Sequence, residues 1–229
     1  MIAVVTATAN EMRAAFPDAP VPAQGQAVEY TFGGRGLLLA VTGVGVVNAA
    51  LSAGRLLAGR TLEGAVNLGI AGAYDPDEYP LLSTCYAWQE TWPEYGLLDE
   101  EGGVDPRGIG FPQGEAGGKP VWNRVKLNPV NDAAAMGLGL ADGWLRASGV
   151  TVSGVTGTPE RAGWLKMSCN ADMENMEGFA LAYAFIQAGL PFLEVRTLSN
   201  LVGSRDSGDW EMKGALKALE GAATTLFSG

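Results

Sequence analysis

The chain has 229 residues, of which 47% are hydrophobic and 17% charged, and its formal net charge is −10. Its length suits one α/β domain with a sizeable core, and its apolar runs are too short to cross a bilayer. Because it is acidic and has no Lys or Arg run, nucleic acid and anionic lipid are disfavoured as partners. We therefore expect a small-molecule substrate.

The residues that are missing limit the chemistry further. Histidine is absent, which removes the commonest general base and every Ser-His or Cys-His mechanism. Cys85 and Cys169 stand apart without metal-ligand spacing, so we expect no metal, no cofactor and no disulfide framework. The segment 1–5 lacks a basic leader, which predicts a cytoplasmic protein. Acid and base chemistry must come from carboxylates, Lys or Tyr.

The first 92 residues alternate between strand-like and helix-like patterns. Such alternation predicts a parallel or mixed sheet that is covered by helices. The expected elements are a strand at 2–8, a hairpin at 28–42, a helix at 46–59, a strand at 65–68 that ends in a small-residue turn at 69–72, and a strand within 81–92.

The second half contains an irregular segment before the alternation resumes. Residues 93–118 are rich in Gly, Pro and acids, and we interpret them as an excursion from a single domain spanning 1–229. The excursion would either close over the substrate with Trp92 and Tyr95 or make a dimer contact. Beyond it we expect a strand at 150–157, a helix at 175–188, a strand at 191–199 and a helix at 209–227.

Two glycines before the 46–59 helix suggest a dinucleotide-binding turn. Gly43 and Gly45 supply the first two positions of GxGxxG, but Asn48 stands where the third glycine is needed. We therefore interpret Gly43–Gly45 as a tight strand-to-helix turn.

Acidic residues gather before the apolar run 179–186. Asp172, Glu174 and Glu177 would stabilise the N-terminus of the predicted helix through its dipole. Glu177 directly precedes residues that must be buried, so its carboxylate also needs hydrogen-bond donors, and sugar hydroxyls are suitable ones.

The strand at 191–199 carries polar residues toward its carboxyl end, where ligands bind in open α/β sheets. Glu194 and Arg196 are either part of such a site or a structural ion pair, and Asn200 is either a ligand or a turn residue. Glu11 follows the first strand and is open to both a site role and that of a first-turn helix acid.

Several motifs together resemble the purine nucleoside phosphorylase/nucleosidase superfamily and, within it, the futalosine hydrolase family. They are VTGVGVVNAA, NLGIAGAY, VSGVTGT, ENMEGFALA and EVRTLSNLVGSRD, and they span nearly the whole chain. Glu177 and Asn200 also have the family spacing of 23 residues. The resemblance implies a three-layer α/β/α sandwich around a mixed, partly closed sheet, and a homo-oligomer.

The resemblance also implies roles for individual residues. Glu177 would hold the ribose hydroxyls with Met176 packed on the sugar, Glu11 would activate water with help from Arg196, and Asn200 would contact the base. Further substrate contacts would come from Ala71, Gly72 and Thr156.

Asn200 stands where the methylthioadenosine nucleosidases have Asp. An amide can donate to the 6-oxo group of hypoxanthine, so the substrate is expected to be a 6-oxopurine nucleoside. The resemblance thus implies hydrolysis of futalosine to hypoxanthine and dehypoxanthine futalosine. Arg205, Arg161 and Lys166 are candidates to meet the carboxylate of futalosine.

Three other functions stay open from the sequence. The phosphate-binding arginines of a phosphorylase are missing from the first turn, which has no Arg before Arg13, and from the 69–73 turn, so water is favoured as the nucleophile. The alternatives are a purine nucleoside phosphorylase, a methylthioadenosine/adenosylhomocysteine nucleosidase and a non-catalytic nucleoside-binding protein.

Overall fold

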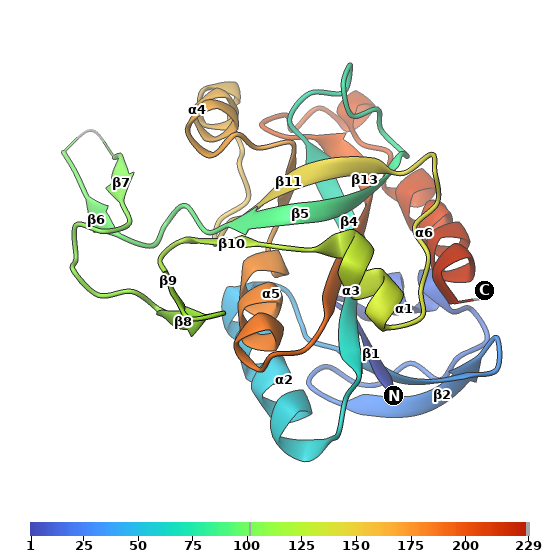
Figure 1. Cartoon of the computed structure of the whole chain (residues 1–229). Helices are drawn as coiled ribbons and strands as arrows, with labels where there is room; N and C mark the ends of the chain where they lie inside the picture. The colour runs from blue at the N-terminus through green and yellow to red at the C-terminus, as the bar shows by residue number, and fades with distance from the viewer. Residues whose placement is uncertain (101, 228–229) are drawn as a thin grey trace.

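The computed structural model describes residues 1–100 and 102–227. Short strands predominate in its middle third and longer ones at both ends (Figure 1). The strands are β1 (Ile2–Thr6), β2 (Ala27–Phe32), β3 (Arg35–Val41), β4 (Gly64–Ala73), β5 (Thr84–Thr91), β6 (Leu97–Leu98), β7 (Val104–Asp105), β8 (Gly114–Ala116), β9 (Lys119–Val121), β10 (Arg124–Lys126), β11 (Leu145–Thr151), β12 (Met173–Asn175) and β13 (Phe192–Leu201).

The helices lie between the longer strands, as the alternation predicts. They are α1 (Ala9–Ala15), α2 (Val46–Gly59), α3 (Pro129–Ala135), α4 (Pro159–Cys169), α5 (Gly178–Gln187) and α6 (Met212–Phe227). A 3-10 turn at Ser207–Asp209 precedes α6.

The large sheet is mixed and partly closed. Its strand order is β10-β5-β11-β12-β4-β1-β3-β2, and β13 pairs with both β4 and β5. The pairing of β13 with β4 is parallel and that with β5 is antiparallel, so β13 closes a ring of strands within the sheet. The parallel strands β1, β4 and β13 therefore end at the same edge.

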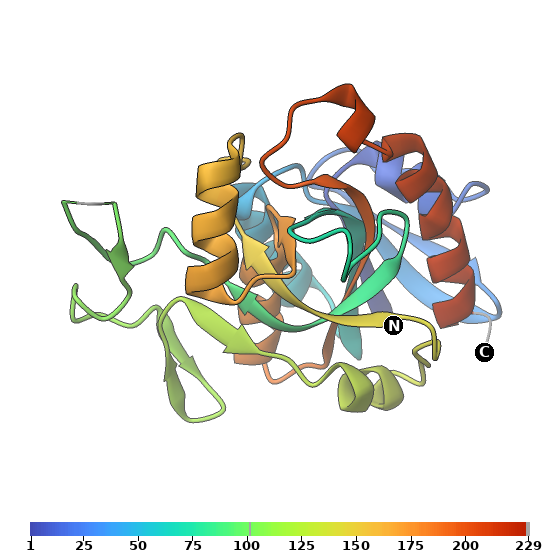
Figure 2. The ribbon, with the colours of Figure 1, turned by 90° about the horizontal axis from the view of Figure 1, so that it is seen from above.

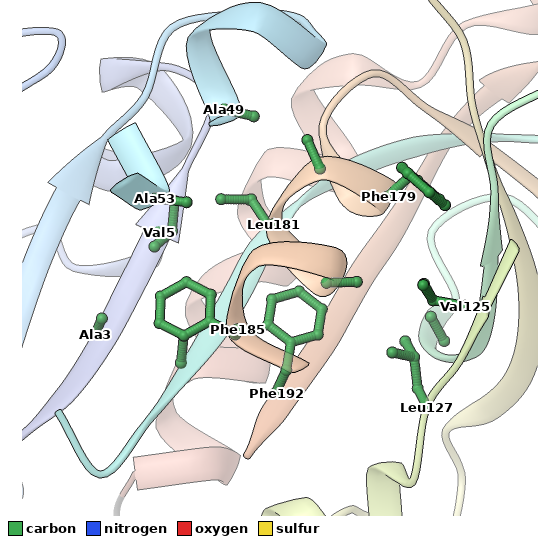
Figure 3. Packing of buried hydrophobic residues seen from close by; sticks show 14 of the residues in the cluster. Ala3, Val5, Ala49, Ala53, Val125, Leu127, Phe179, Leu181, Phe185 and Phe192 are labelled. Carbon is green, nitrogen blue, oxygen red and sulfur yellow. The ribbon is translucent and has the colours of Figure 1, made fainter. Parts of the chain in front are cut away.

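Helices cover both faces of this sheet. Helix α2 packs beside α5 on one face and α1 beside α6 on the other (Figures 1 and 2). On the α2/α5 face, Phe185 stacks on Phe192 at 6.0 Å between ring centroids, and Phe179 lies in the same cluster (Figure 3). The expected three-layer sandwich with a mixed, partly closed sheet is thus confirmed. None of the described helices combines the length and the apolar character of a membrane span.

The sequence predictions fail at several places, and some of these lie near the carboxyl ends of strands. The expected 69–72 turn is wrong, because β4 continues to Ala73 on its hydrogen bonds with β13. The strand expected at 150–157 is displaced, because β11 spans Leu145–Thr151 and shares only its last two residues with the prediction. The expected helix start at 175 is replaced by β12, and α5 begins at Gly178. Helix α4 was not predicted, although Thr158 before Pro159 is a helix-start signal, and its side chain accepts from the Arg161 amide.

The β6–β7 part of the 93–118 excursion projects away from the helices and the large sheet (Figures 1 and 2), whereas β8 contacts α5. The excursion contains the small pair β6–β7 and the first strand of the pair β8–β9. Trp92 at its base stacks on Tyr95 and contacts Phe179 of α5, with ring centroids 5.8 and 6.0 Å apart. The Tyr95 hydroxyl donates to the carbonyl of Phe111 at 2.6 Å.

Candidate active site

A pocket of about 360 Å³ opens where β1, β4 and β13 end. Residues from α1, β12 and the start of α6 complete its wall. Six residues predicted from the sequence line it, namely Glu11, Ala71, Gly72, Met176, Glu177 and Asn200. Thr156 and Arg196, which were also predicted, lie behind the lining residues.

Glu177 lies at the floor of the pocket and precedes α5. The Asn175 side chain fixes this turn, since its Oδ1 accepts from the backbone amides of Glu177 and Gly178 at 3.1 and 2.7 Å. The Glu177 side chain is 4% exposed, and its Oε1 accepts from the Gly45 amide at 2.9 Å. Burial raises the pKa of Glu177, while the Arg196 guanidinium opposes the rise.

The Gly43–Gly45 turn thus does more than connect β3 with α2. Gly45 adopts a φ of 96°, in the region that favours glycine, and there its amide points at Glu177. The sequence interpretation as a tight turn is right, but it missed this contact with the pocket.

Arg196 supports Glu177 from beneath. Its Nε donates to Glu194 Oε1 at 2.9 Å, and its Nη2 lies 3.8 Å from Glu177 Oε2. Its Nη1 also donates to the Ile70 carbonyl at 3.4 Å. The structural pairing with Glu194 therefore exists, and the same guanidinium also faces the candidate ribose-binding carboxylate.

Glu11 also lines the pocket, and it caps α1 as well. Its Oε2 accepts from the Thr8 amide and hydroxyl, both at 2.8 Å, and its Oε1 accepts from the Ile70 amide at 3.1 Å. The two interpretations left open by the sequence, a helix acid and a site residue, both describe its position. These three bonds hold the carboxylate in one orientation.

The run of small residues in β4 makes room for the two charged groups. A Cβ at Gly69 would lie 2.5 Å from Arg196 Nη1 and 2.7 Å from Glu11 Oε1, so any side chain there would force these groups to shift. Gly69, the first glycine of NLGIAGAY, is therefore explained by the crowding of these two side chains and not by a turn.

Asn200 lies across the pocket near the end of β13. Its Oδ1 accepts from the Ser199 hydroxyl at 2.8 Å, and its Nδ2 donates to the Leu201 carbonyl at 3.2 Å. Trp210, which bridges to Asn200 through the backbone, lines the pocket beside it. One Nδ2 hydrogen and one Oδ1 lone pair of Asn200 stay available for a ligand.

Glu174 is a pocket residue that the sequence analysis placed at a helix start. It lies in β12 and accepts from the Tyr74 hydroxyl at 2.9 Å and from the Thr156 amide at 3.0 Å. The Thr156 hydroxyl donates to it as well, at 2.5 Å. Thr156, which is expected to touch substrate, does not line the pocket itself and instead donates two hydrogen bonds to Glu174. The position of Glu174 was missed because a strand of three residues gives too short a pattern to detect.

Two more carboxyl groups are fully buried under the pocket. Glu90 accepts from the Thr151 hydroxyl at 2.6 Å and from the side-chain nitrogen Nδ2 of Asn175 at 2.8 Å. Burial raises the pKa of Glu90. Burial also raises the pKa of Glu194, against the effect of Arg196. Glu90 was not singled out in the sequence. The guanidinium of Arg196 therefore interacts with several buried carboxyl groups.

The excursion contributes nothing to this pocket among the described residues. Trp92 lines a separate apolar groove between α2 and α5, and neither Trp92 nor Tyr95 lines the pocket of Glu177. No metal site of three or more Cys, Asp or Glu occurs within residues 1–100 and 102–227. Carboxylate and amide side chains are prominent among the polar residues that line the pocket.

The fold is that of solved nucleosidase structures. Solved structures of the same fold include 5′-methylthioadenosine/S-adenosylhomocysteine nucleosidase of Campylobacter jejuni, with a TM-score of 0.71 and 18% identity. A futalosine hydrolase mutant of Helicobacter pylori has a TM-score of 0.73 and 14% identity. Each comparison covers 98% of this chain and 95% of the other.

Sequence comparison gives the family. No protein-family model matches the chain. Futalosine hydrolase of Thermus thermophilus is 37% identical over 85% of this chain and 83% of its own length. Futalosine hydrolase of Streptomyces coelicolor is 34% identical over 82% of this chain and 77% of its own length. The chain belongs to the futalosine hydrolase family.

Proposed function

We propose that the protein hydrolyses the N-glycosidic bond of futalosine and releases hypoxanthine and dehypoxanthine futalosine in menaquinone biosynthesis. The observation that carries this proposal is the buried Glu177 carboxylate, which faces the pocket between the Gly45 amide and Arg196. Membership of the family supports the same conclusion.

The ribose is proposed to bind at Glu177. Cleavage of an N-glycosidic bond passes through a sugar with oxocarbenium character, which a nearby negative charge stabilises. Hydroxyl groups of the ribose donate to Glu177, and Met176 in the pocket wall packs on the sugar. Arg196 keeps Glu177 oriented from behind rather than touching the sugar.

Glu11 is the proposed general base for water. Both of its oxygens already accept from backbone or hydroxyl donors, which fix its position and leave one lone pair of Oε1 free for water. A positioned base contributes about 10²- to 10⁴-fold to the rate of such a step. Asn200 holds the departing base, and because an amide supplies no proton, solvent must protonate N7.

Water is favoured over phosphate by the charges around the pocket. In the described part of the chain, no Lys or Arg lines it. Arg13, the first arginine of the sequence, is exposed and donates to Asn10 at 3.1 Å. A phosphate ion would therefore lack the cationic partners that it needs.

An assay of base release tests the function. Purified protein is incubated with futalosine, inosine and methylthioadenosine, each with and without phosphate, and the free base is measured. We expect hypoxanthine from futalosine without any need for phosphate. Dependence on phosphate would identify a phosphorylase, adenine release alone would identify a methylthioadenosine nucleosidase, and binding without turnover would identify a nucleoside-binding protein.

We also propose that the protein is a homo-oligomer. Helix α2 and the turn before it expose Val44, Val47 and Leu51, with Val47 80% exposed. Val44 also lines the pocket of Glu177, so a second copy on this face would extend the wall of the site. Light scattering of the purified protein is expected to give a multiple of 23.8 kDa, and Val47→Asp to shift it toward the monomer.

A further inference from the structure

One carboxylate in the pocket has no part in the proposed mechanism. Glu174 lines the same pocket as Glu177 and Asn200, yet its side chain is only 7% exposed. Tyr74 and Thr156 together give it three hydrogen bonds. A buried carboxylate is costly to keep, and a purely structural anchor has no need to face the pocket.

The strand register places Glu174 opposite Asn200. Glu174 of β12 and Asn200 of β13 are both partners of Gly72 on β4, one on each side. Neighbouring strands lie about 4.8 Å apart, so the two Cα atoms are separated by roughly twice that distance. Gly72 has no side chain to fill the space between them, and a Cβ there would lie 3.1 Å from Asn200 Nδ2.

The hydrogen-bond pattern of a 6-oxopurine suits this pair. Hypoxanthine has a 6-oxo acceptor next to an N1–H donor, whereas adenine has a 6-amino donor next to a bare N1 acceptor. Asn200 has one amide hydrogen available, and Glu174 Oε1, which accepts only from the Thr156 amide, has a free lone pair. An amide donor and a carboxylate acceptor together match the edge of hypoxanthine.

We infer that Glu174 accepts a hydrogen bond from N1–H of the base while Asn200 donates to the 6-oxo group, so that Glu174 selects 6-oxopurines. The inference rests on the proposed hydrolysis of futalosine and adds a specificity-determining residue to it. With adenine in place, N1 and the carboxylate are two acceptors that face each other. Sites built around such hydrogen bonds reject the wrong partner strongly.

Two substrates separate this role from a structural one. Futalosine and its 6-amino counterpart differ only at the edge that Glu174 and Asn200 face. The ratio of their kcat/KM values is measured for the protein itself, for Glu174→Gln and for the matched control Tyr74→Phe. Tyr74→Phe removes one support of Glu174 but leaves the carboxylate in place.

We expect the unaltered protein to prefer futalosine by at least about 10²-fold. Glu174→Gln should lower this ratio at least 10-fold, because a glutamine can also donate to a bare N1. Tyr74→Phe should keep the ratio within about 3-fold. If Glu174→Gln slows both substrates equally, Glu174 only supports the wall and the inference is overturned.

A binding measurement decides the question without turnover or a variant. Calorimetry compares hypoxanthine with 1-methylhypoxanthine, which lacks the N1–H donor, on the unaltered protein. We expect the methylated base to bind at least 10-fold more weakly, and equal binding overturns the inference. A protein that binds hypoxanthine in this selective way but leaves futalosine intact would refute the proposed function while upholding the role of Glu174.

Discussion

Arg196 Nη2 lies 3.8 Å from Glu177 Oε2, and both side chains are almost entirely buried. The same guanidinium binds Glu194 through Nε, so its plane is fixed by a residue two positions earlier on β13. Glu177 therefore meets a cation whose position is set by the sheet and not by the substrate. The arrangement makes the ionised form of a buried carboxylate easier to keep.

Arg196→Lys should lower kcat on futalosine by about 10- to 10²-fold, because misplacement of a supporting group by about 1 Å has effects of this size. Lysine keeps the charge but lacks the planar fork that reaches Glu194 and Glu177 together. Steady-state kinetics and thermal melting of the same preparation check this. Nearly unchanged kcat would mean that the guanidinium fork is not needed.

The pH dependence of kcat/KM should reflect the ionisation of Glu177. Its pKa is raised above the ordinary value of 4.5, chiefly by burial. If the ionised form holds the ribose, kcat/KM should fall on the acid side at a pH above 4.5, since a raised pKa means protonation at higher pH. Glu177→Gln, with the same shape and no charge, should abolish turnover without unfolding the chain. An acid limb centred at or below 4.5 would contradict the assignment.

Glu90→Gln should make the protein more stable at alkaline pH. The pKa of Glu90 is raised from 4.5 by burial and by Glu194, so its contribution to stability is full below 4.5 and is lost as pH rises through the folded-state pKa. Glutamine resembles the protonated acid and does not ionise, so it does not lose this stabilisation as the pH rises. Urea unfolding at several pH values should show a gain that grows with pH, by at most about 1.4 kcal/mol per unit.

The control for this prediction is Glu220→Gln, at an exposed position of α6. It should change the free energy of unfolding by no more than about 0.5 kcal/mol at any pH. An equal, pH-independent effect of both substitutions would show that folding does not shift the pKa of Glu90.

The proposed contact between Asn200 and the purine base can be tested by substitution. Asn200→Asp replaces the amide donor with an acceptor, so the variant should lose activity on futalosine and gain relative activity on its 6-amino counterpart. A loss of about 1–3 kcal/mol in transition-state binding is expected for one unmatched hydrogen bond. Competition between the two substrates, followed by release of hypoxanthine and adenine, measures the change. An unaltered ratio would remove Asn200 from base recognition.

The sequence predicts the parts of this site that follow long, regular patterns. The apolar run after Glu177 and the strand that leads to Asn200 are long enough to place both residues at element ends, and the family motifs then supply their roles. Glu11 could be placed because it follows the first strand directly. These three residues lie on or beside elements whose hydrophobic pattern can be recognised from one sequence alone.

The parts that the sequence misses depend on contacts between distant segments. Glu174 faces the pocket because Met173–Asn175 pairs with both β11 and β4. Three residues are too few to show a strand pattern in the sequence. Glu90 meets Glu194 only because β5 and β13 close the sheet. The turn expected at 69–72 failed for the same reason, since pairing with β13 overrides the weak strand propensity of Gly and Ala.

Gly69 offers the sharpest test of how closely the two charged groups are packed. Gly69→Ala puts a Cβ 2.5 Å from Arg196 Nη1 and 2.7 Å from Glu11 Oε1, so both side chains must shift. Crowding of this kind costs about 1–3 kcal/mol of stability. We expect the loss of activity to exceed what this destabilisation explains, because the groups displaced are the proposed water base and the support of Glu177.

The matched control is Gly163→Ala in the interior of α4, where a Cβ would meet nothing within 4 Å. Alanine is the better helix former, so this variant should be more stable by up to about 1 kcal/mol and keep full activity. Thermal melting and kcat on futalosine, measured side by side, separate the two effects. Full activity in Gly69→Ala would mean that Glu11 and Arg196 tolerate displacement, and their precise placement would then have no part in the reaction.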